Sequence, residues 1–211
     1  GIILPQIQNN ATVCLTFGVI KNIIVTTEDE KMFLRGAIGH FKTITAHRHE
    51  VIKNCFKAGI FFQGLRHDLS KYSWTEFSSG AKYYEDGKRS PNEREREVYG
   101  YSKAWLHHKG RNKHHFEYWT DYDTVTKVLS PIKMPTKYVI EMFCDRVAAS
   151  KTYQGDKYTD SHPINYFLRS KKTRLIHPKT SDYIEFLLRM LEEKGEKTTF
   201  EYIRAHKNDE Y

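Results

Sequence analysis

The sequence of 211 residues has few cysteines and no long apolar run. Its three cysteines, Cys14, Cys55 and Cys144, show no Cys-x-x-Cys spacing, which argues against a disulfide scaffold and a four-cysteine zinc site. The β-branched, apolar stretches 13–20 and 23–25 fall well short of the ~20 residues that cross a bilayer. We therefore expect a cytoplasmic protein with no membrane partner.

Two common phosphate and acyl-transfer motifs are also absent. The chain has neither a Gly-rich phosphate loop of the Walker type nor a Gly-x-Ser-x-Gly nucleophile elbow. Positive charge is plentiful instead, because 34 Lys and Arg face 26 Asp and Glu and give a formal net charge of +8. This excess favours anionic partners, such as a phosphorylated small molecule, a nucleotide or nucleic acid. No feature of the sequence indicates an oligomeric state.

The amino-terminal 31 residues differ from the rest of the chain. They are rich in β-branched and apolar residues, whereas a more regular pattern starts at Met32. We expect residues 1–31 to be an extension, formed by a short β-hairpin, an irregular tail or translated upstream sequence. Residues 32–211 are then the single functional domain.

From Met32 onward the apolar spacing predicts helices, and the fold class is all-α, a compact helical bundle. A helix is predicted to follow Pro135, and an amphipathic one to end at Gly195. Residues 78–100 are predicted to be an exposed loop leading into a solvated helix start. The first predicted stripe consists of Ile44, His47, Val51, Cys55, Ala58 and Phe62. The stripe after Pro135 consists of Val139, Ile140, Met142, Phe143, Val147 and Ala148.

Histidine and aspartate are placed along these elements as metal ligands would be. His47 lies in the first apolar stripe, while His49 points about 160° away on the same helix and is predicted to be a surface group. The pair His67-Asp68 follows, and Asp145 lies near an apolar face, where a carboxylate is costly to bury without a metal or a donor. Imidazole and carboxylate together suit divalent first-row metals.

These residues resemble the HD superfamily of metal-dependent phosphohydrolases. The stretch His-Asp-Leu-Ser-Lys at residues 67–71 is similar to the superfamily's His-Asp-Ile-Gly-Lys, and Asp-Arg-Val-Ala-Ala at 145–149 resembles the segment around its closing Asp. The resemblance implies a bundle of HD-domain type in which His47, His67, Asp68 and Asp145 hold a metal. Residues 33–167 also resemble a family of small uncharacterised bacterial proteins.

A histidine-rich segment lies between these motifs, at residues 105–116. Some HD-superfamily members bind a second metal through extra histidines in this interval. We expect one residue from the pair His107/His108 and one from the pair His114/His115 to be ligands, and the sequence does not select the member. Positive charge surrounds the segment, as a phosphate site requires. The predicted phosphate-binding residues are Lys71, Lys109, Arg111 and Lys113.

The predicted function is a metal-dependent hydrolase that cleaves a phosphomonoester or phosphodiester through metal-activated water. Its cofactor is one or two divalent ions, Mn, Fe, Zn, Ni, Co or Mg, and its catalytic residues are Asp68 and Lys71. Three alternatives stay open. The chain could be an HD-like metal-binding scaffold or sensor without turnover, or its metal a purely structural zinc. It could also be a basic helical nucleic-acid-binding protein in which Tyr118 or Trp119 stacks on a base.

Overall fold

The computed structural model describes the backbone of residues 10–211 and the side chains of residues 27–211. The α-helices are α1 (Asn10–Ala58), α2 (Phe61–Arg66), α3 (Trp74–Lys82), α4 (Pro91–Tyr99), α5 (Lys103–Lys109), α6 (Thr136–Gln154), α7 (His162–Arg169) and α8 (Pro178–His206). Short 3₁₀ turns are η1 (Leu69–Tyr72), η2 (Phe116–Tyr118), η3 (Gly155–Lys157) and η4 (Lys171–Thr173). The strands β1 (Thr120–Tyr122) and β2 (Leu129–Pro131) form the one sheet of this described region. The expected all-α helical bundle is confirmed.

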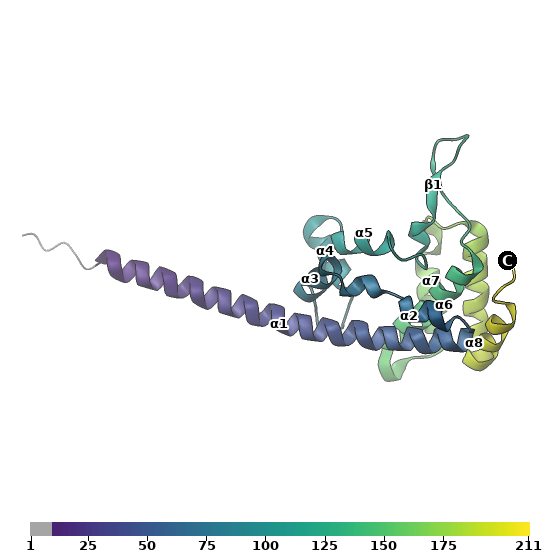
Figure 1. The fold of residues 1–211 in the computed structure, drawn as a ribbon, viewed down its shortest axis with the longest axis horizontal. Coiled ribbons are helices and arrows are strands. Elements are labelled where there is room, and N and C mark those ends of the chain that lie inside the picture. The colour runs from purple at the N-terminus through teal and green to yellow at the C-terminus, as the bar shows by residue number, and fades with distance from the viewer. Residues whose placement is uncertain (1–9) are drawn as a thin grey trace, which may run out of the picture.

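Helix α1 is the longest element and supports most of the others. Its carboxyl-terminal half packs against α2, α3, α6 and α8, while its amino-terminal half extends away from the rest of the molecule (Figure 1). No helix within residues 10–211 is both long enough and apolar enough to cross a membrane.

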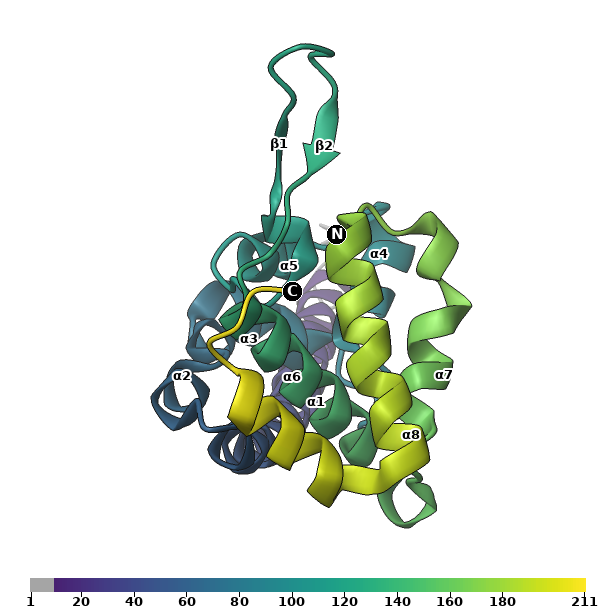
Figure 2. The same ribbon diagram turned by 90° about the vertical axis from the view of Figure 1, so that its right-hand side faces the viewer.

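The core is built around α6. This helix lies between α1 and α8 (Figure 2), and all six residues of its predicted stripe are buried. Cys55 of α1 and Cys144 of α6 are fully buried as small core residues. The side-chain amide of Asn54 donates a hydrogen bond to the carbonyl of Cys144, at 3.1 Å, which fixes α1 against α6. The core therefore holds rigid the two helices that carry His47 and Asp145.

Glycines end or bend two of the predicted helices. Helix α1 ends at Ala58, because Gly59 has a φ of 76°, a left-handed conformation that glycine adopts without strain. Phe62 therefore lies on α2 and is 76% exposed, so its predicted place in the buried stripe is wrong. Gly195, predicted to end the last helix, instead bends α8, which continues to His206.

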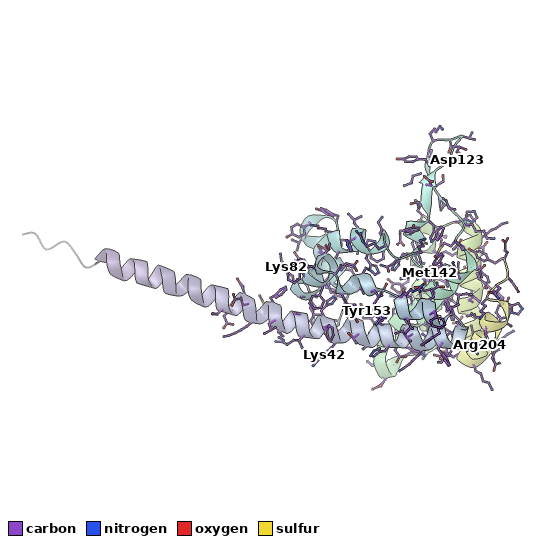
Figure 3. All side chains as sticks on the ribbon, viewed as in Figure 1. Lys42, Lys82, Asp123, Met142, Tyr153 and Arg204 are labelled. Carbon is purple, nitrogen blue, oxygen red and sulfur yellow. The ribbon has the colours of Figure 1, made fainter. Side chains whose placement is uncertain are left out.

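The strands form a hairpin, but not where the sequence suggested one. Strand β1 pairs antiparallel with β2, and the hairpin projects from the body, with Asp123 near its end (Figure 3). The hairpin expected within residues 1–31 is wrong for residues 10–31, which are helical, and residues 1–9 lie outside the described part of the chain. The predicted loop at 78–100 is partly wrong, because α3 extends to Lys82, whereas α4 at 91–99 agrees with the predicted solvated helix start.

Candidate metal centre

The backbone at His67-Asp68 directs both side chains to one buried point. Helix α2 ends at Arg66, and Asp68 adopts the left-handed conformation, with φ 54° and ψ 25°. Aspartate tolerates the left-handed region better than most residues. A residue other than glycine in this region often marks a functional position. The guanidinium of Arg48 donates a hydrogen bond to the carbonyl of His67, at 3.1 Å, and ties this junction to α1. Both side chains are almost fully buried.

The first group of candidate ligands is the one expected from the sequence. Donor atoms of His47, His67, Asp68 and Asp145 all lie within 4.8 Å of one another. Nε2 of His47 is 3.0 Å from Oδ1 of Asp145, and Nε2 of His67 is 3.3 Å from Oδ2 of Asp68. Helix α1, the α2–η1 junction and α6 thus bring together residues that are far apart in the sequence.

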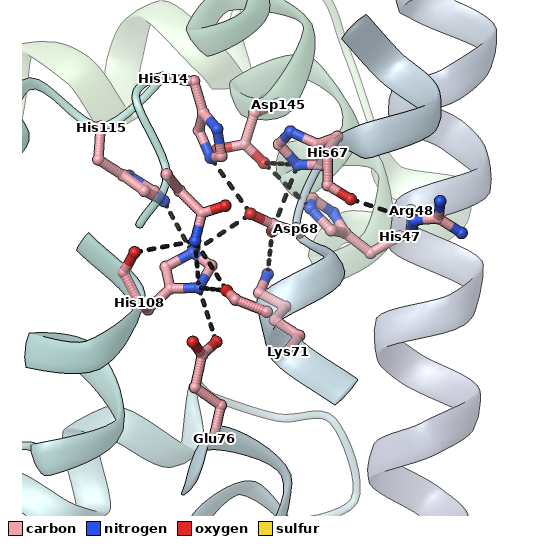
Figure 4. Close-up of polar contacts among 12 residues, drawn as sticks. His47, Arg48, His67, Asp68, Lys71, Glu76, His108, His114, His115 and Asp145 are labelled. Atoms are coloured by element: carbon pink, nitrogen blue, oxygen red, sulfur yellow. Dashed lines mark hydrogen bonds and ion pairs between the residues drawn. The ribbon is translucent and has the colours of Figure 1, made fainter. Parts of the chain in front are cut away.

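A second group shares Asp68 with the first. It consists of Asp68, His108, His114 and His115, again with donor atoms within 4.8 Å. Oδ1 of Asp68 lies 3.3 Å from Nε2 of both His108 and His114, whereas Oδ2 faces His67. Asp68 therefore lies between the two groups, with one carboxylate oxygen directed to each (Figure 4). We refer to both groups together as the His–Asp cluster.

The structure distinguishes the two members of one histidine pair but not those of the other. His108 belongs to the second group, while Nδ1 of His107 lies 2.6 Å from a carboxylate oxygen of Glu76 and faces neither group. The other pair is not divided, because His114 and His115 both belong to the second group.

Two glutamates that the sequence reasoning missed hold the histidines in place. Oε1 of Glu141 lies 2.9 Å from Nδ1 of His67 and 3.1 Å from Nδ1 of His114, and Glu76 lies 2.8 Å from Nδ1 of His108. When Nδ1 donates its proton to a carboxylate, the Nε2 lone pair is free to face a metal. Glu141 could have been found from its position one helical turn before Asp145.

The centre of the cluster contains buried polar atoms without hydrogen-bond partners. These are Nε2 of His67, Nε2 of His114 and Oδ1 of Asp68, and Oδ2 of Asp68 likewise accepts no hydrogen bond although it is ion-paired with Lys71. Native proteins rarely leave such atoms unpaired, and a metal ion bound here would satisfy them. Nitrogen and carboxylate oxygen are the donors that divalent first-row metals accept, so these residues fit such an ion.

Electrostatics also favour a positive charge here. Burial alone would raise the pKa of Asp68, but the charges of His67 and Lys71 outweigh it and hold this pKa well below its usual range. Burial likewise disfavours a charged His67, yet Asp68 raises its pKa well above the ordinary value. The carboxylates of the cluster thus stabilise cationic partners.

The four predicted phosphate-binding residues differ in their position relative to the His–Asp cluster. Nζ of Lys71 lies 2.7 Å from Oδ2 of Asp68, and its side chain is 29% exposed. Arg111 donates to the carbonyl of His107, at 3.3 Å, and the ammonium of Lys113 lies 5.7 Å from the centre of the Tyr118 ring. Lys109 is half-buried and interacts with Glu117. Only Lys71 of these four residues forms an ion pair with the cluster in the described part of the chain.

The two aromatic residues proposed for base stacking, Tyr118 and Trp119, differ in how far they are buried. Trp119 packs against the core, and its indole N–H donates to the carbonyl of Lys113 at 2.7 Å. Tyr118 is 38% exposed. Tyr118 alone therefore offers much of its ring to a ligand.

Comparison with known families gives one assignment. Residues 36–190 match the family described as a family of unknown function (DUF5662). The chain belongs to this family. The matched DUF5662 region contains the complete His–Asp cluster, Glu76 and Glu141. Comparisons with curated proteins and with solved structures gave no match. Membership of the HD superfamily stays a prediction.

Proposed function

We propose that this DUF5662 protein is a metal-dependent hydrolase of HD type that acts on a phosphomonoester or phosphodiester, with nucleotides among its substrates. The observation that carries the proposal is the gathering of buried histidine nitrogens and carboxylate oxygens into two groups that share Asp68, where Nε2 of His67 and Nε2 of His114 have no hydrogen-bond partner. Such atoms would destabilise a purely structural core, because each buried polar atom costs free energy when it is left unpaired.

The candidate ligands form two sets, and each set would hold one ion. His47, His67, Asp68 and Asp145 would hold one ion, and Asp68, His108, His114 and His115 would hold the other. Glu141 and Glu76 fix the rings of His67, His114 and His108 so that Nε2 faces the centre. A divalent ion bound there supplies an acidified water molecule and polarises a phosphoryl oxygen.

Lys71 supplies a fixed positive charge at the same place. Burial would lower its pKa, but Asp68 raises that pKa above the usual range, so the ammonium stays charged at neutral pH. Its partly exposed side chain lets it meet a phosphate oxygen as a point charge. Cys144 does not compete as a nucleophile, because burial raises the pKa of its thiol well above the ordinary value.

The test combines metal content with turnover. Purified protein is analysed for bound elements and assayed on phosphomonoesters and phosphodiesters with and without added manganese. We expect at least one equivalent of metal and metal-dependent hydrolysis in the wild type. Asp68→Asn keeps the size of the side chain but removes the shared carboxylate, so metal affinity should fall by about 10–100-fold or more and hydrolysis should be lost.

His107→Gln is the matched control, because it removes a neighbouring imidazole that faces neither group. This variant should keep its metal and most of its activity. An Asp68→Asn protein that keeps full activity would refute the proposal. Metal binding without turnover of any phosphate ester would also refute it, in favour of a scaffold or sensor.

A further inference from the structure

Two arginines next to the His–Asp cluster both lie near the ring of Phe167. Arg146 follows Asp145 on α6, and Arg174 lies in the segment between η4 and α8. The guanidinium carbons of Arg146 and Arg174 lie 5.5 and 4.9 Å from the centre of the Phe167 ring. Arg174 also donates a hydrogen bond to the carbonyl of Phe167, at 2.9 Å. The fold thus holds two like charges close to one buried ring.

Neither guanidinium forms an ion pair within the described residues, although Asp145 acts on Arg146 at longer range. Nε of Arg146 is buried without a hydrogen-bond partner. The contact of Nη2 of Arg146 is the sulfur of Met142, at 3.9 Å. Glu117 interacts electrostatically with both arginines but forms an ion pair with neither in the described region, and burial raises the pKa of its carboxyl group.

Burial and the neighbouring charge of Arg146 both act on the pKa of Arg174. Burial and the charge of Arg146 lower the pKa of Arg174 to about 10, so it stays charged at neutral pH. Two partly buried positive charges of this kind are costly unless an anion joins them. Arginine pairs suit phosphate in particular, because each guanidinium can donate two parallel hydrogen bonds.

The arginine pair is close to the cluster, and both arginine residues are partly exposed. Asp145 interacts electrostatically with both Lys71 and Arg146. Tyr166 interacts with both arginines and is 60% exposed. The pair is therefore bordered by Asp145 on one side and by the exposed Tyr166 on another.

We propose that Arg146 and Arg174 form a subsite for a phosphate group of the substrate, beside the metal-binding residue Asp145. This rests on the proposed function and assigns the role of anion recognition to residues outside the histidine-rich segment. The charge pattern of the sequence instead favours Lys71, Lys109, Arg111 and Lys113 for that role. A phosphate with two negative charges matches the two positive charges of the pair.

The test uses inorganic phosphate and the full chain treated with a chelator, so that binding to metal does not contribute. Isothermal titration at low ionic strength gives the dissociation constant. We expect Arg174→Gln to weaken phosphate binding by about tenfold or more, because it removes a charge-assisted, two-point contact. Arg169→Gln is the control, since it removes the same charge from an exposed position on α7. Its effect should stay within about twofold, as screened surface charge predicts.

Arg146→Lys is a conservative second variant, because it keeps the positive charge but loses the planar guanidinium. Circular dichroism checks that each variant is folded. Arg146→Lys too should weaken phosphate binding. Equal effects of Arg174→Gln and Arg169→Gln, or no phosphate binding by the wild type, would overturn the subsite.

The subsite and the hydrolase proposal can fail separately. Phosphate binding that depends on Arg174 in a protein without hydrolytic activity would support the subsite and reject the hydrolase. Metal-dependent hydrolysis with an unchanged KM in both arginine variants would do the reverse.

Discussion

At the scale of single residues, Asp68 combines an uncommon backbone conformation with a shared role. In a continuous helix, the side chains of consecutive residues diverge by about 100°, so His67 and Asp68 would not reach one point. The left-handed conformation of Asp68 separates α2 from η1 and lets both side chains face the cluster. The carboxylate then meets histidines of both groups, one through each oxygen.

Buried histidines with opposite pKa shifts determine how stability changes with pH. Burial, aided by Lys71, lowers the pKa of His40 from 6.5 to about 4, so its contribution is lost as the pH falls from 6.5 toward 4. Burial opposes a charged His67, but Asp68 raises its pKa well above 6.5, so its contribution is complete below 6.5 and lost at higher pH. Thermal unfolding of chelator-treated protein should therefore show a maximum midpoint near pH 6.5.

Added manganese supplies the control for this pH profile. Metal binding needs an unprotonated His67 and releases its proton, so the stabilisation by manganese should grow as the pH rises. The maximum should then move to higher pH. A chelator-treated protein whose stability rises steadily through neutral to alkaline pH would contradict the assignment to His67.

Residue spacing was enough to find some candidate ligands and not others. Helical phase selects His47 over His49, and the structure places His47 in the first group while His49 is exposed. The same reasoning does not separate His107 from His108, because α5 is short and its orientation is fixed by its neighbours. Glu141 was missed because one carboxylate on an apolar stripe does not reveal its histidine partners, which come from other segments.

At the scale of elements, a close approach of α1 and α3 supports the cluster, and glycine makes it possible. A Cβ atom at Gly36 of α1 would lie 2.2 Å from the backbone oxygen of Ala81 on α3. Gly36→Ala should therefore force the helices apart and lower the free energy of unfolding by about 2 kcal/mol, since overpacking outweighs the gain in helix propensity. Urea unfolding measures the loss.

Gly39→Ala is the matched substitution on the same helix. Its Cβ would meet the ring of Tyr84, also at 2.2 Å, but a tyrosine side chain can rotate whereas the backbone of α3 cannot. The loss should therefore be smaller. Equal stabilities of Gly36→Ala and the wild type would show that α1 and α3 are not held this closely.

The prediction of elements succeeded where the pattern was long and failed at breaks. The stripe of α6 is predicted correctly because its apolar residues repeat over several turns between Pro135 and Gly155. The predicted stripe of α1 wrongly included Phe62, which lies beyond the left-handed Gly59 on α2. Residues 10–31 were misjudged because β-branched residues lower helix propensity only slightly, which a long continuous helix tolerates.

At the scale of the whole molecule, α1 connects two regions of different character. Its 49 residues correspond to a rod of roughly 70 Å, and only its carboxyl-terminal half lies against the other helices (Figure 1). Described contacts of α1 with the body begin near Arg35, which pairs with Asp86 at 3.5 Å, and Gly36. The core cluster and both groups of candidate ligands lie at or beyond His47.

This arrangement predicts that residues 32–211 fold alone and bind metal. The shortened chain keeps Arg35, Gly36 and His40, and therefore the contacts of α1 with α3 and with the segment before α4. Loss of a projecting segment should cost about 0.5 kcal/mol or less, which corresponds to roughly 1–2 °C in the unfolding midpoint. Calorimetry and elemental analysis of both chains measure the difference.

A second truncation tests where the domain begins. A chain that starts at residue 42 lacks Gly36, Gly39 and His40, so the packing of α1 against Gly80 and Tyr84 of the next segment is lost. It should unfold at a clearly lower temperature and lose metal, because α3 carries Glu76, which positions His108. If residues 32–211 failed to fold while the full chain did, the amino-terminal extension would belong to the domain. The boundary near Met32 would then be wrong, because stability would depend on contacts made before that residue.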